Sequence, residues 1–332
     1  MSPNIFPFRT VAFGSAILVL CGLAALLLVQ TDSEAQTVGT SILLANAPPF
    51  VSSVRLSNSA FGSEEYSGGI NSLVPGGTKT VYLNGVVQDN NSGDQIDHVD
   101  SVFYRSGVAG AGGCVENDGN DCYKVFDCEL SSDGVTSLQR RYSCPLDLWY
   151  FADSTVAGGE FPDDHWVASV TVFDRAGAQA TNASLTREIQ TLLALHVPNS
   201  VNYGILSVGE STDETNEFAH VISQEGNDES DAEVSYSTAP GAPGYGGTMD
   251  CVHNGGIGAV PSRRQQWSVV PNHYGGSGSV SLTAVPSIVP LGVGYRHGAT
   301  VPSEPIYWNI SIPDSGVSGT CTGSVTISAV SH

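Results

Sequence analysis

The sequence has few basic residues. Its 332 residues include 12 Lys and Arg against 33 Asp and Glu, which gives a formal net charge of -21. A surface this acidic repels phosphate backbones, so we expect no nucleic-acid partner.

Motifs for the common catalytic chemistries are also missing. The sequence contains no G-x-S-x-G, H-E-x-x-H or C-x-x-C motif, no P-loop and no dinucleotide-binding fingerprint. These absences argue against serine-hydrolase, zinc and nucleotide chemistry. The run "DDH" at 163–165 offers metal-ligand residue types but favours a solvated turn. We therefore expect a protein that is not an enzyme. A secreted hydrolase is the remote alternative, and a cleft that gathers Asp, His and Ser would support it.

The N-terminus predicts export. Arg9 precedes 19 largely apolar residues from Val11 to Val29, and Ser33-Glu34-Ala35 provides small residues at the two positions that a signal peptidase reads. Residues 1–35 are thus a signal peptide cleaved after Ala35 or, because the run is long enough to span a bilayer, a retained membrane anchor. Either alternative places the remainder outside the cell or on its surface, with membrane contact only through this segment. Residues 36–50 form an extended leader.

Cysteine usage agrees with export. Removing residues 1–35 takes away Cys21 and leaves an even number of cysteines, which in an exported chain predicts disulfides. They are Cys114, Cys122, Cys128, Cys144, Cys251 and Cys321. Their number allows many pairings. The clustering of four in one segment and two in the second half favours 114–122, 128–144 and 251–321.

Period-two alternation over short runs predicts an all-β protein. "TKTVYLNGVVQD", "HWVASVTVFD" and "IYWNISI" each place apolar side chains on one face, and turn residues separate the runs. We expect two tandem immunoglobulin-like antiparallel β-sandwich domains, residues 51–192 with a cysteine-rich insert at 106–145, and residues 193–332. In "IYWNISI" we expect Asn309 to face water, and in "CTGSVTISA" we expect Cys321 to lie in the strand. The segment 186–198 fits both a helix and a strand, and we favour the strand.

Two stretches resemble known immunoglobulin-like families. "VPNSVNYGILSVGEST" resembles the opening of the ASH/HYDIN type, through Pro198, Tyr203-Gly204 and Val208-Gly209-Glu210. "NAPPFVSSVRL" and "VASVTVFDRAG" are similar to the first and last strands of tandem modules on bacterial and archaeal surface proteins. The resemblance implies a fold and an exported surface location. It implies no catalytic residue, because such modules usually have none.

Acidic loops make calcium the most plausible cofactor. Hard cations bind clustered oxygens on flexible loops, although neither loop here has EF-hand spacing and polar turns are the favoured interpretation of both. The candidate ligands are Asp89, Asn91, Asp94 and Asp97 in one loop, and Glu116, Asp118 and Asp121 in the other. Asp174 instead predicts a turn, with its carboxylate accepting backbone N–H bonds up to Gly177.

Surface chemistry leaves two further possibilities. Three sequons make Asn90, Asn182 and Asn309 candidate glycosylation sites. Aromatic residues could form a carbohydrate platform, although a core position is favoured for the first three. They are Trp149, Tyr150, Phe151, Tyr245 and Tyr274.

Together these patterns predict a structural cell-surface or extracellular protein. Its partners would be other copies of itself or other surface proteins, and the apolar run "SILLANAPPF" in the leader could add as an edge strand to a neighbouring copy. The alternative is a carbohydrate-binding adhesin with glycan partners.

Overall fold

The computed structural model describes residues 39–108, 110–115, 118–214, 218–236 and 247–332. The predicted signal or anchor segment, residues 1–35, lies outside them. Asn46–His332 forms one compact unit, and residues 39–45 belong to a separate one. Within the described ranges, no helix is long and apolar enough to cross a membrane. Every sheet is antiparallel, which confirms the all-β prediction.

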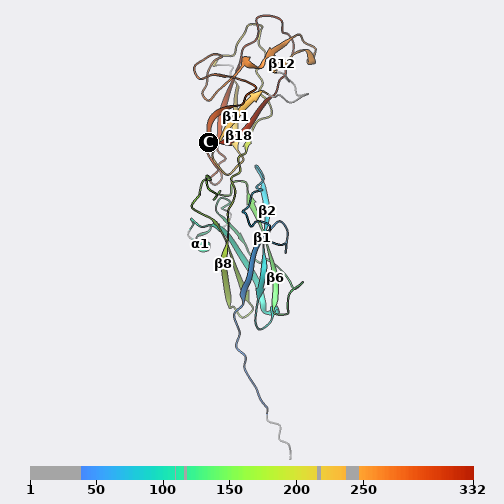
Figure 1. Ribbon diagram of the computed structural model, residues 1–332, viewed down its shortest axis with the longest axis vertical. Coiled ribbons are helices and arrows are strands. Elements are labelled where there is room, and N and C mark those ends of the chain that lie inside the picture. Colours follow the sequence, from blue (N-terminus) through green and yellow to red (C-terminus); the bar gives the residue numbers. More distant parts are fainter. Residues whose placement is uncertain (1–38, 109, 116–117, 215–217, 237–246) are drawn as a thin grey trace, which may run out of the picture. The chain divides into compact units, whose positions relative to one another are not determined.

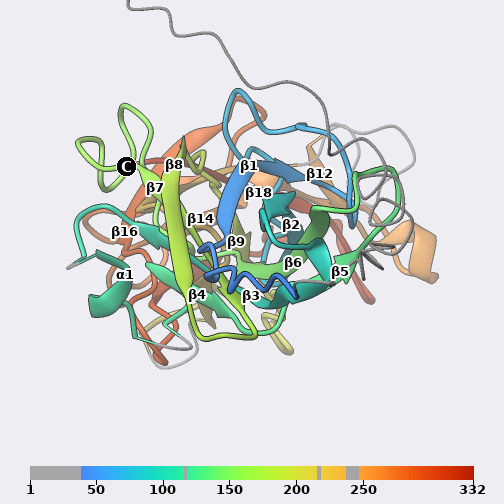
Figure 2. The same ribbon diagram turned by 90° about the horizontal axis from the view of Figure 1, so that it is seen from below.

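The first half of the compact unit is a sandwich of two four-stranded sheets, called here the N-terminal sandwich. The strand orders are β1-β2-β6-β5 and β4-β3-β7-β8. The strands are β1 Phe50–Ser57, β2 Thr78–Gln88, β3 Ile96–Arg105, β4 Cys122–Val125, β5 Glu129–Ser131, β6 Gln139–Trp149, β7 Trp166–Asp174 and β8 Gln179–Arg187. β1, β2 and β6 run side by side (Figure 1), and β8 lies beside β1 where the two sheets meet (Figure 2). A short helix, α1 Gly110–Gly113, lies in the cysteine-rich insert.

Alternation explains the core of the N-terminal sandwich. Every second residue of β2 from Val81 to Val87 faces inward, except that Gly85 replaces a side chain in this row. A Cβ on Gly85 would lie only 2.0 Å from the carbonyl oxygen of Ser53. The glycine therefore leaves room for the Tyr142 hydroxyl, which donates to that oxygen at 2.9 Å. Trp166 is fully buried, with its ring 5.0 Å from Phe103.

The second half, called here the C-terminal sandwich, pairs the sheets β15-β14-β17-β10-β9 and β16-β11-β18, with a separate hairpin β12-β13. The strands are β9 Leu195–His196, β10 Phe218–Gln224, β11 Ser230–Tyr236, β12 Thr248–Asp250, β13 Ala259–Pro261, β14 Gln265–Ser268, β15 Val280–Ser281, β16 Ser287–Val293, β17 Ser303–Ile310 and β18 Val325–Ser331. β11 and β18 lie side by side (Figure 1). Trp308 and Ile306 of β17 are fully buried in its core.

The ambiguous segment 186–198 is neither of the elements considered for it. β8 ends at Arg187, Ile189 forms an isolated bridge with Ile70, and only Leu195–His196 pair again, as β9. Leu192 packs against the core of the N-terminal sandwich, and Leu195 packs against that of the C-terminal sandwich. Its apolar side chains therefore serve two cores, which explains why one period does not fit them.

Three disulfides brace the fold, and they are the pairs that the clustering favoured. Cys114–Cys122 closes the insert, with its Cα atoms 5.4 Å apart. Cys128–Cys144 joins the segment before β5 to β6, at 4.7 Å. Cys251–Cys321 crosses 70 residues of the C-terminal sandwich, at 3.9 Å. Cys321 lies outside a strand, because β18 begins only at Val325.

Candidate interaction site

The described part of the leader is an exposed apolar segment. Ile42, Leu43 and Leu44 have exposed fractions of 82%, 96% and 76%, and residues 39–49 form no strand. Soluble proteins rarely leave a contiguous apolar run in water unless it binds a partner. No residue from 36 to 50 carries a charge, although the whole chain has a net charge of -21.

The leader is held where it joins the N-terminal sandwich. The Asn46 side-chain amide donates to Asp174 Oδ2 at 2.7 Å, and the Ala47 backbone N–H donates to Asn91 Oδ1 at 2.7 Å. Asp174 Oδ1 also accepts the backbone N–H groups of Ala176 and Ala178, which confirms its predicted turn role. One carboxylate thus closes the β7–β8 hairpin and fixes the residue from which the leader departs.

These hydrogen bonds make the attachment sensitive to acid. They lower the pKa of Asp174 below its ordinary 3.8, with the Asn46 amide as the largest cause. A lowered folded-state pKa stabilises the fold above pH 3.8, and that contribution is lost as the pH falls through the folded pKa. We expect Asn46→Ala to move the pKa of Asp174 up towards 3.8, as read by NMR titration. An unchanged pKa in this variant would show that Asn46 does not hold the carboxylate.

The C-terminal sandwich contains an open groove with an aliphatic floor. Its volume is about 630 Å³, within the range of typical ligand sites. Val260 and Ile310 form a buried floor, together with the partly buried Ile312. Ile205 at its rim is 100% exposed, and Val208 is 55% exposed. The groove therefore combines aliphatic side chains, several of which contact water, with uncharged polar residues such as Asn202 and Thr320.

The two walls of the groove lie outside the strands, and one of them makes isolated antiparallel bridges, Ile257 with Ser318 and Asp250 with Thr322. Residues 200–206 form one wall and make no backbone–backbone hydrogen bond to another described segment. Residues 317–322 form the other, and the Cys251–Cys321 disulfide fixes it to the sheet below. No charged residue lines the groove. The Gly204 N–H donates to Asn202 Oδ1 within the 200–206 wall. A wall whose backbone does not pair with another strand, beside an apolar floor, has the features of a site for an added strand.

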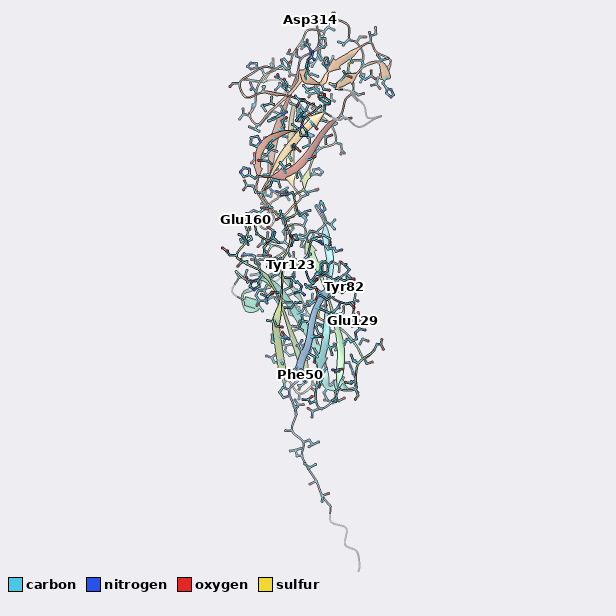
Figure 3. The ribbon with its side chains drawn as sticks, in the orientation of Figure 1. Phe50, Tyr82, Tyr123, Glu129, Glu160 and Asp314 are labelled. Atoms are coloured by element: carbon cyan, nitrogen blue, oxygen red, sulfur yellow. A yellow bond between two sulfur atoms is a disulfide. The ribbon has the colours of Figure 1, made fainter. Side chains whose placement is uncertain are left out.

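Asn46, where the leader is attached, and the groove each lie at the end of their own sandwich that is away from the connecting segment. Within the N-terminal sandwich, the chain enters at Phe50, opposite the end that carries Glu160 (Figure 3). It leaves at Ile189, whose backbone N–H donates to Thr155 Oγ1 at 3.2 Å near that second end. Within the C-terminal sandwich, β9 meets the Ser223 end of β10, which pairs with Ser303 at the start of β17. The groove lies at the other end of β17, where Ile310 forms part of its floor. Asp314 follows at the same end (Figure 3).

The first predicted calcium loop has most of its acidic groups engaged elsewhere. Asp89 Oδ1 accepts the Asn91 backbone N–H at 2.7 Å, and Asp94 pairs with Arg140. Asp97 contacts its neighbour His98 at 2.9 Å. Asp89 Oδ2 is buried without a hydrogen-bond partner among the described residues. Across the described ranges, no three His, Cys, Asp or Glu side chains converge as metal ligands, and calcium here stays a prediction.

The acidic groups of the second predicted calcium loop do not come together among the described residues. Glu116 lies outside the described residues. Asp118 Oδ1 accepts the Asn120 backbone N–H at 3.1 Å, and Asp121 lies 3.9 Å from the Arg105 guanidinium. These contacts belong to turns and ion pairs and provide no shared centre for a cation.

The predicted water-facing position of Asn309 is wrong. Its side chain is fully buried, accepts a hydrogen bond from Thr212 Oγ1 at 2.8 Å and donates to the Asn272 carbonyl at 3.0 Å. A glycan cannot be attached there in the folded chain, because the amide nitrogen is enclosed and bonded. Asn90 is exposed and Asn182 is partly exposed, and both stay candidate glycosylation sites.

The predicted aromatic platform is reduced to one ring. Tyr150 and Phe151 are buried, as favoured, while Trp149 is 43% exposed and stacks on Phe151 with a ring separation of 5.7 Å. Tyr274 is partly buried, and Tyr245 lies outside the described residues.

Ser106, Asp164 and His165 come together without the arrangement of a catalytic triad. Ser106 Oγ donates directly to Asp164 Oδ1 at 3.2 Å and accepts a hydrogen bond from the His165 backbone N–H at 3.1 Å. The histidine thus contributes its main chain, and the carboxylate takes the place that a general base would need beside the hydroxyl. Asp164 is also paired with Arg105. The group joins the segment after β3 to the segment before β7.

Arg105 is the centre of a charged cluster that no sequence motif predicted. Its Nε donates to Asp153 Oδ2 at 2.8 Å, and its guanidinium lies 3.8 Å from the centre of the Phe161 ring. Burial raises the pKa of Asp153 to about 7, although Arg105 and Asn120 partly offset this. The cluster joins β3 to the loops that precede β7 and holds a buried carboxylate in place.

Comparison with known proteins gives no assignment. No protein-family model and no curated protein matches this chain. The resemblance to immunoglobulin-like surface modules therefore stays a prediction.

Proposed function

We propose that this chain is a non-enzymatic structural protein of the cell surface or extracellular space, which assembles with other copies of itself through its leader. The single observation that carries this proposal is the leader. Three consecutive aliphatic side chains are exposed, uncharged and unpaired beside a compact folded unit. Burying such a segment against another subunit is favourable, because it removes apolar surface from water.

Covalent bracing supports the proposed location. Three disulfides are typical of oxidising compartments, where reduction does not undo them. With the apolar N-terminal run, they favour export as a pair of immunoglobulin-like modules after a signal peptide or anchor. A non-enzymatic role is supported by the polar groups themselves. The buried carboxylates Asp153 and Asp174 are engaged in holding turns and ion pairs.

A carbohydrate-binding adhesin is the second candidate, and Trp149 favours it. Sugars stack through their apolar faces on flat rings, and this indole is exposed and supported from below by Phe151. Glycan binding that disappears in a Trp149→Ala variant would favour this alternative over a purely structural role.

Assembly is tested by removing the leader residues alone. The full chain, produced in a host that exports it, should show a particle size that grows with protein concentration in sedimentation velocity. Deleting residues 39–45 should leave a monomer, because the exposed apolar segment is gone. The sandwich should keep its fold, because Asn46 and Ala47 retain their hydrogen bonds to it. An unchanged circular-dichroism spectrum controls for folding. A full chain that stays monomeric at every concentration would contradict the proposal.

A further inference from the structure

We propose that the groove of the C-terminal sandwich binds residues Ile42–Leu44 of a second copy as an added strand. This inference rests on the proposed function and names the receiving surface for it. The groove favours an occupant that is apolar and extended, because its floor is aliphatic and its 200–206 wall makes no backbone–backbone hydrogen bond to another described segment. The leader is a segment of this chain that has both properties.

The absence of charge on both surfaces makes a contact between two copies favourable. Two copies that each carry a net charge of -21 repel each other over most of their surfaces. Neither the leader nor the groove contains a charged residue. The two surfaces can therefore meet without bringing like charges together at the contact, and no buried charge is left unpaired.

Chain reach argues against the same copy. Seven residues span at most about 25 Å when extended, whereas the nine-residue strand β7 alone is about 30 Å long. The leader is attached at Asn46, which is hydrogen-bonded to Asp174 at the C-terminal end of β7. The chain continues to the C-terminal sandwich from the opposite end of β7. Residues 39–45 thus cannot pass their own first sandwich to enter their own groove.

A contact of this type builds an open assembly. The leader and the groove are different surfaces, so each copy offers one donor and one acceptor. Such a heterologous contact repeats from copy to copy and gives a filament, or a ring if the rotation closes.

Side chains alternate between the two faces of a strand, and this alternation predicts which leader side chains enter the groove. Residues 42 and 44 share one face, and residue 43 points to the other. The face with Ile42 and Leu44 is the more apolar, because the opposite phase includes Ser41. We expect Ile42→Asp and Leu44→Asp each to weaken association by about tenfold or more, and Leu43→Asp to have a much smaller effect.

The acceptor is tested at its exposed rim, where substitution leaves the fold intact. Ile205→Asp with Val208→Asp should abolish association of the full chain in sedimentation velocity. The matched control is Val285→Asp with Val301→Asp, two exposed positions of the same sandwich outside the groove, at 74% and 41% exposed. The control should associate like the unmodified chain.

The decisive experiment mixes two variants, neither of which should assemble by itself. The chain lacking residues 39–45 keeps an acceptor, and the Ile205→Asp/Val208→Asp chain keeps a donor. Together they should form a one-to-one dimer that grows no further. If leader deletion blocks assembly but the rim variant assembles normally, this inference is overturned and the proposed function stands. If the unmodified chain never assembles, the proposed function itself fails.

Discussion

Replacing Arg105 with Met is expected to destabilise the N-terminal sandwich by about 3–5 kcal/mol at pH 8 and by clearly less at pH 5. The substitution keeps most of the aliphatic stem but removes the cation that pairs with Asp153. The Asp153 side chain is 1% exposed, so without Arg105 its carboxyl either stays charged and unpaired in the interior or takes up a proton that the unfolded chain has released. Breaking a buried pair on one side costs more than the pair contributes, because the remaining charge has lost its solvation.

The pH dependence follows from the raised pKa of Asp153. Its folded-state value of about 7 exceeds the ordinary 3.8. Between these values the folded chain holds a proton that the unfolded chain has released, so stability falls as the pH rises through this window and levels off above it. Removing Arg105 raises the folded pKa further, because Arg105 is the main group that lowers it. The free energy of unfolding of the variant therefore keeps falling to a higher pH than that of the unmodified chain.

Urea unfolding at pH 5 and pH 8 measures both effects, with Trp166 as the reporter, since its indole donates to the Asp153 carbonyl at 2.9 Å. Two further variants separate the causes. Adding Asp153→Asn to Arg105→Met should recover much of the loss at pH 8. Asp164→Asn, at a partner that is 22% exposed, should cost about 1 kcal/mol or less. An equal loss at both pH values in Arg105→Met would contradict a buried charge as its origin.

The strands of this fold could be predicted because their signal is local. β2, β7 and β17 each alternate apolar and polar residues over the length of one strand. The turn role of Asp174 was also interpretable from its neighbours, because the backbone donors to its Oδ1 lie within four residues, whereas its bond from Asn46 was not predicted. The cysteine pairs followed from their clustering.

The failures have a common cause, which is contact between distant segments. Asn309 alternates like a water-facing residue, yet Thr212 and Asn272 enclose it from 97 and 37 residues away. The groove has no sequence pattern, because its lining comes from residues 200–208, 310–322 and the β12–β13 hairpin. The leader could be predicted to need an apolar partner, but the surface that fits it emerges only from the folded chain.

Removing the Cys251–Cys321 bridge is expected to cost the C-terminal sandwich about 4 kcal/mol, the largest loss among the three disulfides. A cross-link restricts the unfolded chain more when it closes a longer loop, and this bridge spans 70 residues. The Cys114–Cys122 bridge spans 8 residues and should contribute about 2.5 kcal/mol on the same basis. The test compares Cys251→Ala/Cys321→Ala with the matched control Cys114→Ala/Cys122→Ala in urea unfolding.

The location of each loss should follow the location of each bridge. The buried Trp267 and Trp308 report on the C-terminal sandwich, and the buried Trp166 reports on the N-terminal one. The Cys251→Ala/Cys321→Ala variant should shift the unfolding transition reported by Trp267 and Trp308. The transition reported by Trp166 should change only as far as the two sandwiches unfold together. Because Cys321 belongs to the 317–322 wall of the groove, the same variant should also weaken assembly while its fold persists. Equal losses for the two variants would show that loop length does not govern these bridges, and unimpaired assembly would show that the wall needs no covalent anchor.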